Sequence, residues 1–148
     1  MELLWAGQWF HAHEELELAW RPASGDRKLL LQALIQWAVG LEHLRRGNPR
    51  GALGQWQKCT DKLGRLPPGL LGVDVAGGRD ALRRFGTQIA LEQRSHRFVE
   101  GRGRPESLAG MPPLPAEETW PLPRLQGEPV ETADSGSAGE AAVPPACT

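Results

Sequence analysis

Apolar residues recur at helical spacing in four stretches of the chain, and no stretch of useful length alternates with period two. The predicted helices cover about residues 7–21 (starting at Leu3 or Gly7), 27–46, 49–65 and 79–99. Ser24 or Asp26 is a suitable N-cap for the second helix, and Asn48 followed by Pro49 is a strong start for the third. Short connections favour antiparallel neighbours, so the sequence predicts an all-α fold, a small up-and-down bundle of four helices.

The composition changes after residue 100. Residues 101–148 hold nine of the thirteen prolines together with 3 basic and 7 acidic residues, whereas residues 1–100 hold 14 basic and 11 acidic ones. Such proline- and glycine-rich sequence is typical of unstructured chain. We therefore expect a helical domain over residues 1–100 and a disordered acidic tail over residues 101–148, whose removal would leave the melting temperature unchanged.

Several features favour a cytoplasmic protein. Cys59 and Cys147 make no disulfide framework, and the N-terminus lacks the pattern of a secretory signal. The longest apolar segment, residues 29–41, is too short to span a bilayer. The charge is too balanced to predict binding to a membrane or to nucleic acid.

The first long helix carries two ionisable residues on its apolar face. His13 and Glu17 are one helical turn apart in the middle of that face, so both need partners if they are buried. On the next helix, Gln32, Gln36 and His43 form a polar stripe. The two helices are therefore expected to enclose a polar cluster of His13, Glu14, Glu17, Gln32, Gln36 and His43.

An antiparallel pairing across residues 22–26 predicts which members of this cluster meet. It places Gln36 beside His13 and Gln32 beside Glu17. The same register puts His43 near Ala6, about 10 Å along the helix from His13. One interpretation is a closed hydrogen-bond network that fixes how the helices pack.

The other interpretation is a divalent metal site. The run His13-Glu14-Glu15-Leu16-Glu17 resembles the zinc-protease pattern H-E-x-x-H, with Glu17 in place of the second histidine. His13, Glu17 and His43 would then be the metal ligands, and Glu14 would be a further ligand or the catalytic base.

A resemblance to a known family rests on three runs. LxxGxWFxAHEELELAW, LLLQALIQWAVGLEHLRRGNPRGA and GVDV, within about residues 4–75, resemble the bacterial and archaeal family catalogued as domain of unknown function 309. The resemblance implies a compact all-helical fold and no established activity. The motif positions fall on His13, Glu14, Glu17, Trp20, Gln36, His43, Asn48 and Gly51.

The tryptophans are expected to serve the core more than a site. Trp9, Trp20, Trp37 and Trp56 have helical spacing, whereas Trp5 and Trp120 are expected to be exposed. Trp120, within ETWPLPRL, is either a short docking motif or an incidental apolar residue. The arginines near the C-terminal end of the predicted domain favour a solvated face over a nucleic-acid contact, and Asp74 is expected to cap a helix.

The leading hypothesis is a non-enzymatic binding or interaction module that contains the His/Glu/Gln cluster. The competing hypothesis is a metal-dependent enzyme, hydrolytic in class, that uses the same residues. An accessory role with nucleic acid is a weaker third possibility, and self-association through Trp37 or Trp56 stays open.

Overall fold

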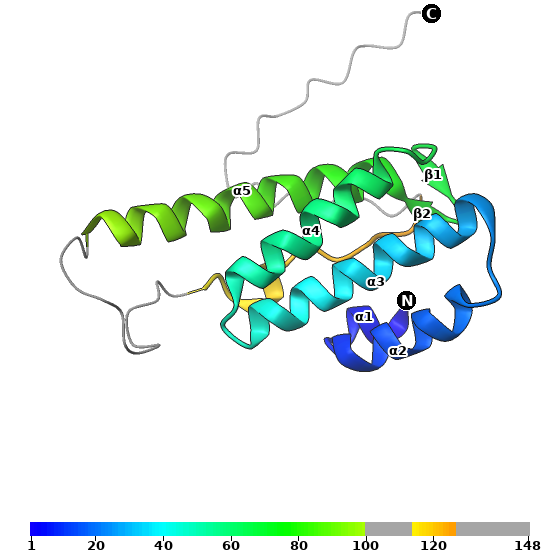
Figure 1. Ribbon diagram of the computed structural model, residues 1–148, viewed down its shortest axis with the longest axis horizontal. Coiled ribbons are helices and arrows are strands. Elements are labelled where there is room, and N and C mark those ends of the chain that lie inside the picture. The colour runs from blue at the N-terminus through cyan, green and yellow to red at the C-terminus, as the bar shows by residue number, and fades with distance from the viewer. Residues whose placement is uncertain (100–113, 127–148) are drawn as a thin grey trace, which may run out of the picture.

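The computed structural model describes residues 1–99 and 114–126. Four long helices form the bundle (Figure 1), which confirms the all-α prediction. They are α2 (Trp9–Trp20), α3 (Gly25–Arg45), α4 (Pro49–Leu63) and α5 (Val75–Val99), preceded by the single turn α1 (Glu2–Trp5). The predictions for residues 100–113 and 127–148, Cys147 included, lie outside the described residues.

Two helix starts differ from the prediction. The first helix is broken into α1 and α2 because Gly7 has a φ of +72°, which no continuing helix allows. The last helix begins at Val75 instead of residue 79, because the Asp74 carboxylate accepts the Gly77 backbone N–H at 3.0 Å. Asp74 therefore caps a helix, as predicted.

The connector before α5 contains a small hairpin where the sequence predicted irregular chain. The strands β1 (Gly69–Leu70) and β2 (Val73–Asp74) pair antiparallel. Leu71 and Gly72, with φ of 51° and 76°, make the tight turn between them. The hairpin ends at the first turn of α5, so it fixes where that helix starts.

Helix α3 forms the centre of the bundle and packs against both α2 and α4. A Cβ at Gly40 would lie only 2.2 Å from Nε1 of Trp56, so this glycine is what lets the indole of α4 reach α3. That indole donates to the carbonyl of Trp37 at 3.3 Å. Of the four tryptophans predicted to be in the core, Trp9, Trp37 and Trp56 are buried. Trp20 is half-buried beneath the ammonium of Lys28.

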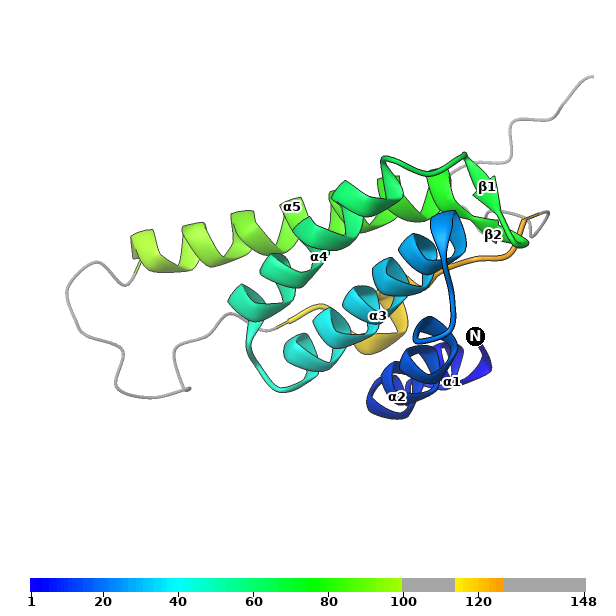
Figure 2. The ribbon, with the colours of Figure 1, turned by 45° about the vertical axis from the view of Figure 1, so that its right-hand side comes forward.

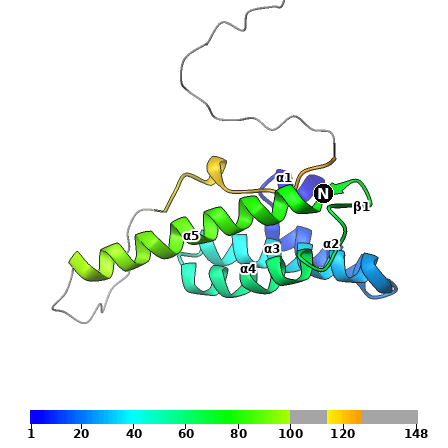
Figure 3. The same ribbon diagram turned by 90° about the horizontal axis from the view of Figure 1, so that it is seen from above.

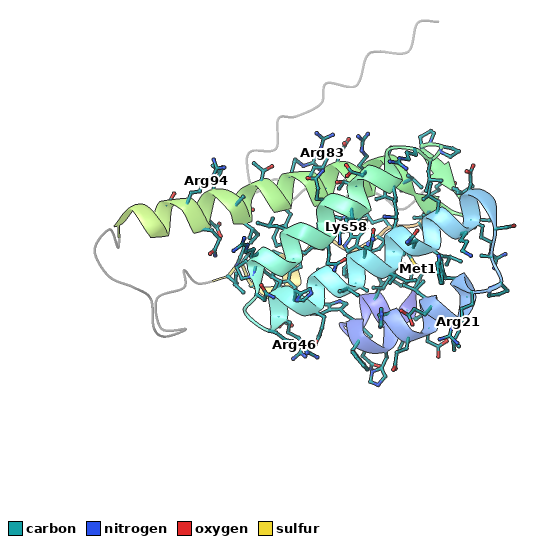
Figure 4. The ribbon with its side chains drawn as sticks, in the orientation of Figure 1. Met1, Arg21, Arg46, Lys58, Arg83 and Arg94 are labelled. Atoms are coloured by element: carbon teal, nitrogen blue, oxygen red, sulfur yellow. The ribbon has the colours of Figure 1, made fainter. Side chains whose placement is uncertain are left out.

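Cys59 on α4 is buried and unpaired, and burial raises the pKa of its thiol. It is a core residue, as its place on an apolar arc predicted. None of the helices in the described part of the chain has the length and apolar content to span a bilayer. Arg83 and Arg94 of α5 point away from the bundle (Figure 4), in keeping with a solvated face.

Residues 114–126, here called the strap, are the described part of the predicted tail, and their packing on the bundle differs from the disorder expected of them. The strap runs lengthwise along the bundle towards the hairpin (Figure 2), on the face opposite α4 (Figure 3). Trp120 is 6% exposed, not solvated as expected. At the far end, Leu125 bridges Val73, and the Gln126 N–H donates to the Gly72 carbonyl at 2.8 Å. The composition of the strap suggested disorder because so few apolar residues cannot form a core by themselves. The strap instead buries its apolar residues against the bundle.

Candidate functional site

The predicted pair of His13 and Glu17 is present on α2 but is not enclosed. Nε2 of His13 lies 3.0 Å from Oε1 of Glu17, and the two side chains are 26% and 42% exposed. The partner that the imidazole needed is thus its own helix neighbour, not an amide of α3. Glu14 is exposed on the same helix and does not line the pocket described next.

A pocket of about 240 Å³ lies between α2 and α3. Its apolar walls come from Trp9, Phe10 and Val39. Its polar lining comes from residues of both helices, namely His13, Glu42, His43 and Arg46. Two imidazoles from different helices therefore line one small cavity near the end of α3 that Arg46 marks in Figure 4.

The structure brings His43 and His13 to one pocket, which the predicted pairing of α2 with α3 did not. His43 shares a pocket with Phe10 and His13, whereas counting from the connecting turn placed it near Ala6. Such counting assumes parallel helix axes, and packed helices usually cross at an angle, so the error grows away from the turn.

The glutamines do not make the predicted hydrogen bonds. Oε1 of Gln36 is buried and has no hydrogen-bond partner. Neither Gln36 nor Gln32 lines the pocket, and His13 has Glu17 as its partner instead. Of the polar residues Gln32, Gln36 and His43 that were predicted to form the α3 side of the cluster, only His43 lines the pocket.

Asn48 fixes the protonation of His43. Its Oδ1 accepts the backbone N–H of Gly51 at 2.9 Å as the N-cap of α4, so its Nδ2 is left to face the imidazole. Nδ2 lies 3.2 Å from Nδ1 of His43, and an amide nitrogen can only donate. Nδ1 is therefore the acceptor, and the proton of the neutral imidazole sits on Nε2.

Gly51 leaves the space that this arrangement needs. A Cβ there would lie 2.6 Å from Nδ2 of Asn48 and 2.9 Å from Nδ1 of His43. Gly47, with a φ of +71°, makes the turn that leads into the cap. The run Gly47-Asn48-Pro49-Arg50-Gly51 thus caps the N-terminus of α4 and stabilises one tautomer of the His43 imidazole.

Glu42 is the acidic member of the pocket. Its carboxylate accepts hydrogen bonds from the guanidinium groups of Arg45 and Arg46, each at 2.6 Å in its shortest contact. The hydrogen bond from Arg45, with that from Arg46, lowers the pKa of Glu42 to about 2. The carboxylate is therefore ionised at neutral pH and its charge is already compensated, and Arg46 keeps further N–H groups for other acceptors.

The candidate metal ligands are not gathered into a metal centre. Among the side chains that the structure describes, no group of three or more His, Cys, Asp or Glu is placed to hold a metal ion. His13 and His43 share the pocket, while Glu17 lies beside His13 but not in the pocket lining.

Sequence reasoning missed part of the pocket lining. Trp9 was assigned to the core, and Glu42 and Arg46 were not singled out. The spacing of Glu42 to Arg45 and Arg46, three and four residues along one helix, was the available signal for the ion pairs.

The fold and site define a small helical domain with a polar-rimmed pocket between its first two long helices. Residues 1–55 match the family model described as Domain of unknown function (DUF309), in agreement with the resemblance seen in the sequence. The match covers every pocket residue together with Asn48 and Gly51, but neither the GVDV run nor the strap. No curated protein and no solved structure gave a significant match.

Proposed function

We propose that the domain is a non-enzymatic binding module whose ligand is a small carboxylate with an apolar body. The observation that carries this proposal is that two imidazoles, each held through one ring nitrogen, line one pocket with an aromatic wall. A volume of about 240 Å³ is slightly below that of drug-sized ligand sites, so the ligand is small.

The donors of the pocket favour an anionic group. Nε2–H of His43 and the free N–H groups of Arg46 donate, and neither is consumed within the protein. The carboxylate of Glu42 does not oppose an anion strongly, because two guanidinium groups already pair with it. The rings of Trp9 and Phe10 supply the contact for the apolar body.

Two features argue for binding over catalysis. Glu14, the candidate base, lies outside the pocket, and the described residues bring no third ligand to the two imidazoles. Asn48 and Gly51, which hold the imidazole of His43, also lie in the part of the chain that matches the family model. A cytoplasmic location, which the sequence suggested, is part of the proposal.

The test uses benzoate as the probe and benzyl alcohol as its neutral control. Two-dimensional NMR of the full chain measures the binding of each compound. Benzoate is expected to give saturable shifts of the His43, Arg46 and Trp9 signals, with a Kd of about 1 mM for so small a ligand. His43→Ala is expected to weaken binding about tenfold, because it removes a hydrogen bond to a charged group. His11→Ala, at an exposed histidine of α2 that does not line the pocket, should have no effect.

Two results would contradict the proposal. Equal shifts from benzoate and benzyl alcohol would show that no anion site exists. Stoichiometric zinc binding in a calorimetric titration, lost in both His13→Ala and His43→Ala, would instead favour the metal-dependent alternative.

A further inference from the structure

The strap is held by indole groups of the bundle. Trp5 of α1 donates its Nε1–H to the carbonyl of Pro123, and Trp37 of α3 donates to the carbonyl of Pro121, each at 2.9 Å. Both acceptors are backbone atoms of proline residues two positions apart. The bundle therefore recognises the main chain of the strap at a fixed spacing.

A third tryptophan of the bundle contacts a side chain of the strap. The ring of Trp9 on α2 stacks on that of Trp120 with centroids 5.1 Å apart and planes 26° apart. The indole N–H of Trp120 in turn donates to the carbonyl of Pro115 at 2.9 Å. This hydrogen bond folds the start of the strap back onto the Trp120 ring. Stacked aromatic pairs of this kind add stability beyond the area that they bury.

Two residues of the strap, Ala116 and Trp120, have polyproline II values of φ and ψ, namely −56° and 139° and −71° and 137°. They flank the single 3-10 turn η2 (Glu117–Thr119), which hydrogen bonds within the strap close. The carbonyls of Pro121 and Pro123, which follow this turn, accept from Trp37 and Trp5. Aromatic grooves that recognise proline-rich segments bind chain in this extended conformation.

We propose that the groove of Trp5, Trp9 and Trp37 is a binding site for proline-rich segments of the pattern Trp-Pro-x-Pro on a separate protein. The strap is the resident ligand of this groove, held in place by its covalent tether, and a partner segment displaces it. The proposal does not depend on the ligand pocket, with which it shares only Trp9.

The family match separates the groove from its present occupant. Trp5, Trp9 and Trp37 all lie within residues 1–55, which match the family, whereas the strap lies outside them. The three indole contacts of the strap thus lie in the matched part of the chain, while its contacts with Gly72 and Val73 lie outside that part.

The strap also leaves part of its surroundings open. A cavity of about 760 Å³ lies between the strap and α5, with Phe85, Arg84 and Gln88 among its lining residues. Trp5 stays 40% exposed although its N–H is bonded. A partner segment therefore has a place to start its contact before the strap has left.

The tether makes the strap a strong competitor. A covalently attached ligand competes at an effective concentration, taken as about 1 mM. If a free segment binds the empty groove with a Kd of about 10 μM, the occupied groove binds it about 100-fold more weakly. The domain is therefore expected to bind only those partner proteins that make several contacts with it or that are present at high local concentration.

The experiment measures binding of a labelled peptide of residues 114–126 to the full chain by fluorescence anisotropy. Trp120→Ala in the protein removes the stack on Trp9 and weakens the attachment of the strap, so it is expected to tighten peptide binding at least tenfold over the unmodified chain. The same peptide carrying Trp120→Ala is expected to lose most of its affinity.

Two matched variants test the indole donors in the Trp120→Ala background. Trp5→Phe removes the N–H that reaches Pro123 and should weaken the peptide by about two- to tenfold, the size of one hydrogen bond. Trp20→Phe makes the same chemical change at an indole N–H that has no partner, so it should leave the affinity unchanged. No peptide binding to a folded Trp120→Ala chain would overturn the proposal.

A second measurement uses the unmodified chain, in case Trp120→Ala does not fold. The Gln126 amide, bonded to the Gly72 carbonyl, reports release of the strap in hydrogen exchange. Exchange faster than that of core amides such as Ile89, and faster still with added peptide, supports displacement. Exchange only through global unfolding would make the strap a fixed part of the fold and overturn the proposal. A dimer that forms with rising concentration and dissolves with peptide would also overturn it, by assigning the groove to a second copy.

Discussion

Trp9 and Trp120 stack with their ring centroids 5.1 Å apart, and Trp9 is also a wall of the pocket that contains His13 and His43. One indole therefore touches both surfaces for which we propose a ligand. A change at the strap can reach the pocket through this ring, because a packed aromatic side chain has few alternative positions.

Trp120→Ala is expected to lower the free energy of unfolding by about 3 kcal/mol, since it empties a buried site and removes the stack on Trp9. Urea denaturation of the full chain measures the loss. Leu125→Ala, at a strap residue that is 36% exposed, should stay within about 0.5 kcal/mol of the unmodified protein. Equal stability of both variants would mean that the strap does not contribute, as its composition alone suggested.

The bundle was predictable because its signals are local. Periodic apolar residues, the Asn48-Pro49 start and the Asp74 cap each act within one or two turns of helix, and each was found in the structure. The break at Gly7 was missed because glycine inside an apolar pattern does not reveal its φ.

The site and the strap were less predictable because they depend on distant contacts. The pairing of His13 with Glu17 is local, but the meeting of His13 and His43 depends on the packing of α2 against α3, which no pattern along one helix reports. Composition classified residues 114–126 as unstructured, since it takes no account of a groove formed by Trp5, Trp9 and Trp37.

Asn48 offers a paired test of how His43 is held. Asn48→Ala should cost about 1 kcal/mol through loss of the cap and leave both tautomers of His43 populated. Asn48→Asp keeps an oxygen for the Gly51 N–H but presents a second acceptor to the imidazole, so the proton of His43 should move to Nδ1. Nitrogen-15 shifts of the ring report the tautomer. An unchanged tautomer in Asn48→Asp would show that the 3.2 Å contact does not govern it.

Gln36→Leu tests whether α3 carries a polar network. Because Oε1 of Gln36 is buried without a partner, replacing the amide by an apolar group of similar size should leave stability unchanged or raise it by up to about 1 kcal/mol. Gln57→Leu makes the same change on the exposed face of α4 and serves as the control, expected within about 0.5 kcal/mol. A loss of 2 kcal/mol or so in Gln36→Leu alone would instead favour the network predicted from sequence.

Glu42 gives the protein a stability term that depends on acid pH. Its pKa is lowered from 4.5 to about 2 by Arg45 and Arg46, so ionised Glu42 favours the folded state. For a lowered carboxyl pKa this contribution is complete above pH 4.5 and disappears as the pH falls through about 2. The two guanidinium groups are 48% and 62% exposed, so solvent screening limits it to about 1 kcal/mol.

Glu42→Gln should therefore cost about 1 kcal/mol in urea denaturation at pH 7 and much less at pH 2, because about half of the unmodified side chain is then protonated in the folded state. Glu15→Gln, at an exposed position of α2 for which no ion pair is seen, is the control and should change stability little at either pH. The same loss at both pH values would assign the effect of Glu42 to packing in the pocket wall. Since Glu42 lines the pocket, the variant should also strengthen benzoate binding, because it removes a negative charge beside the anion and frees Arg46.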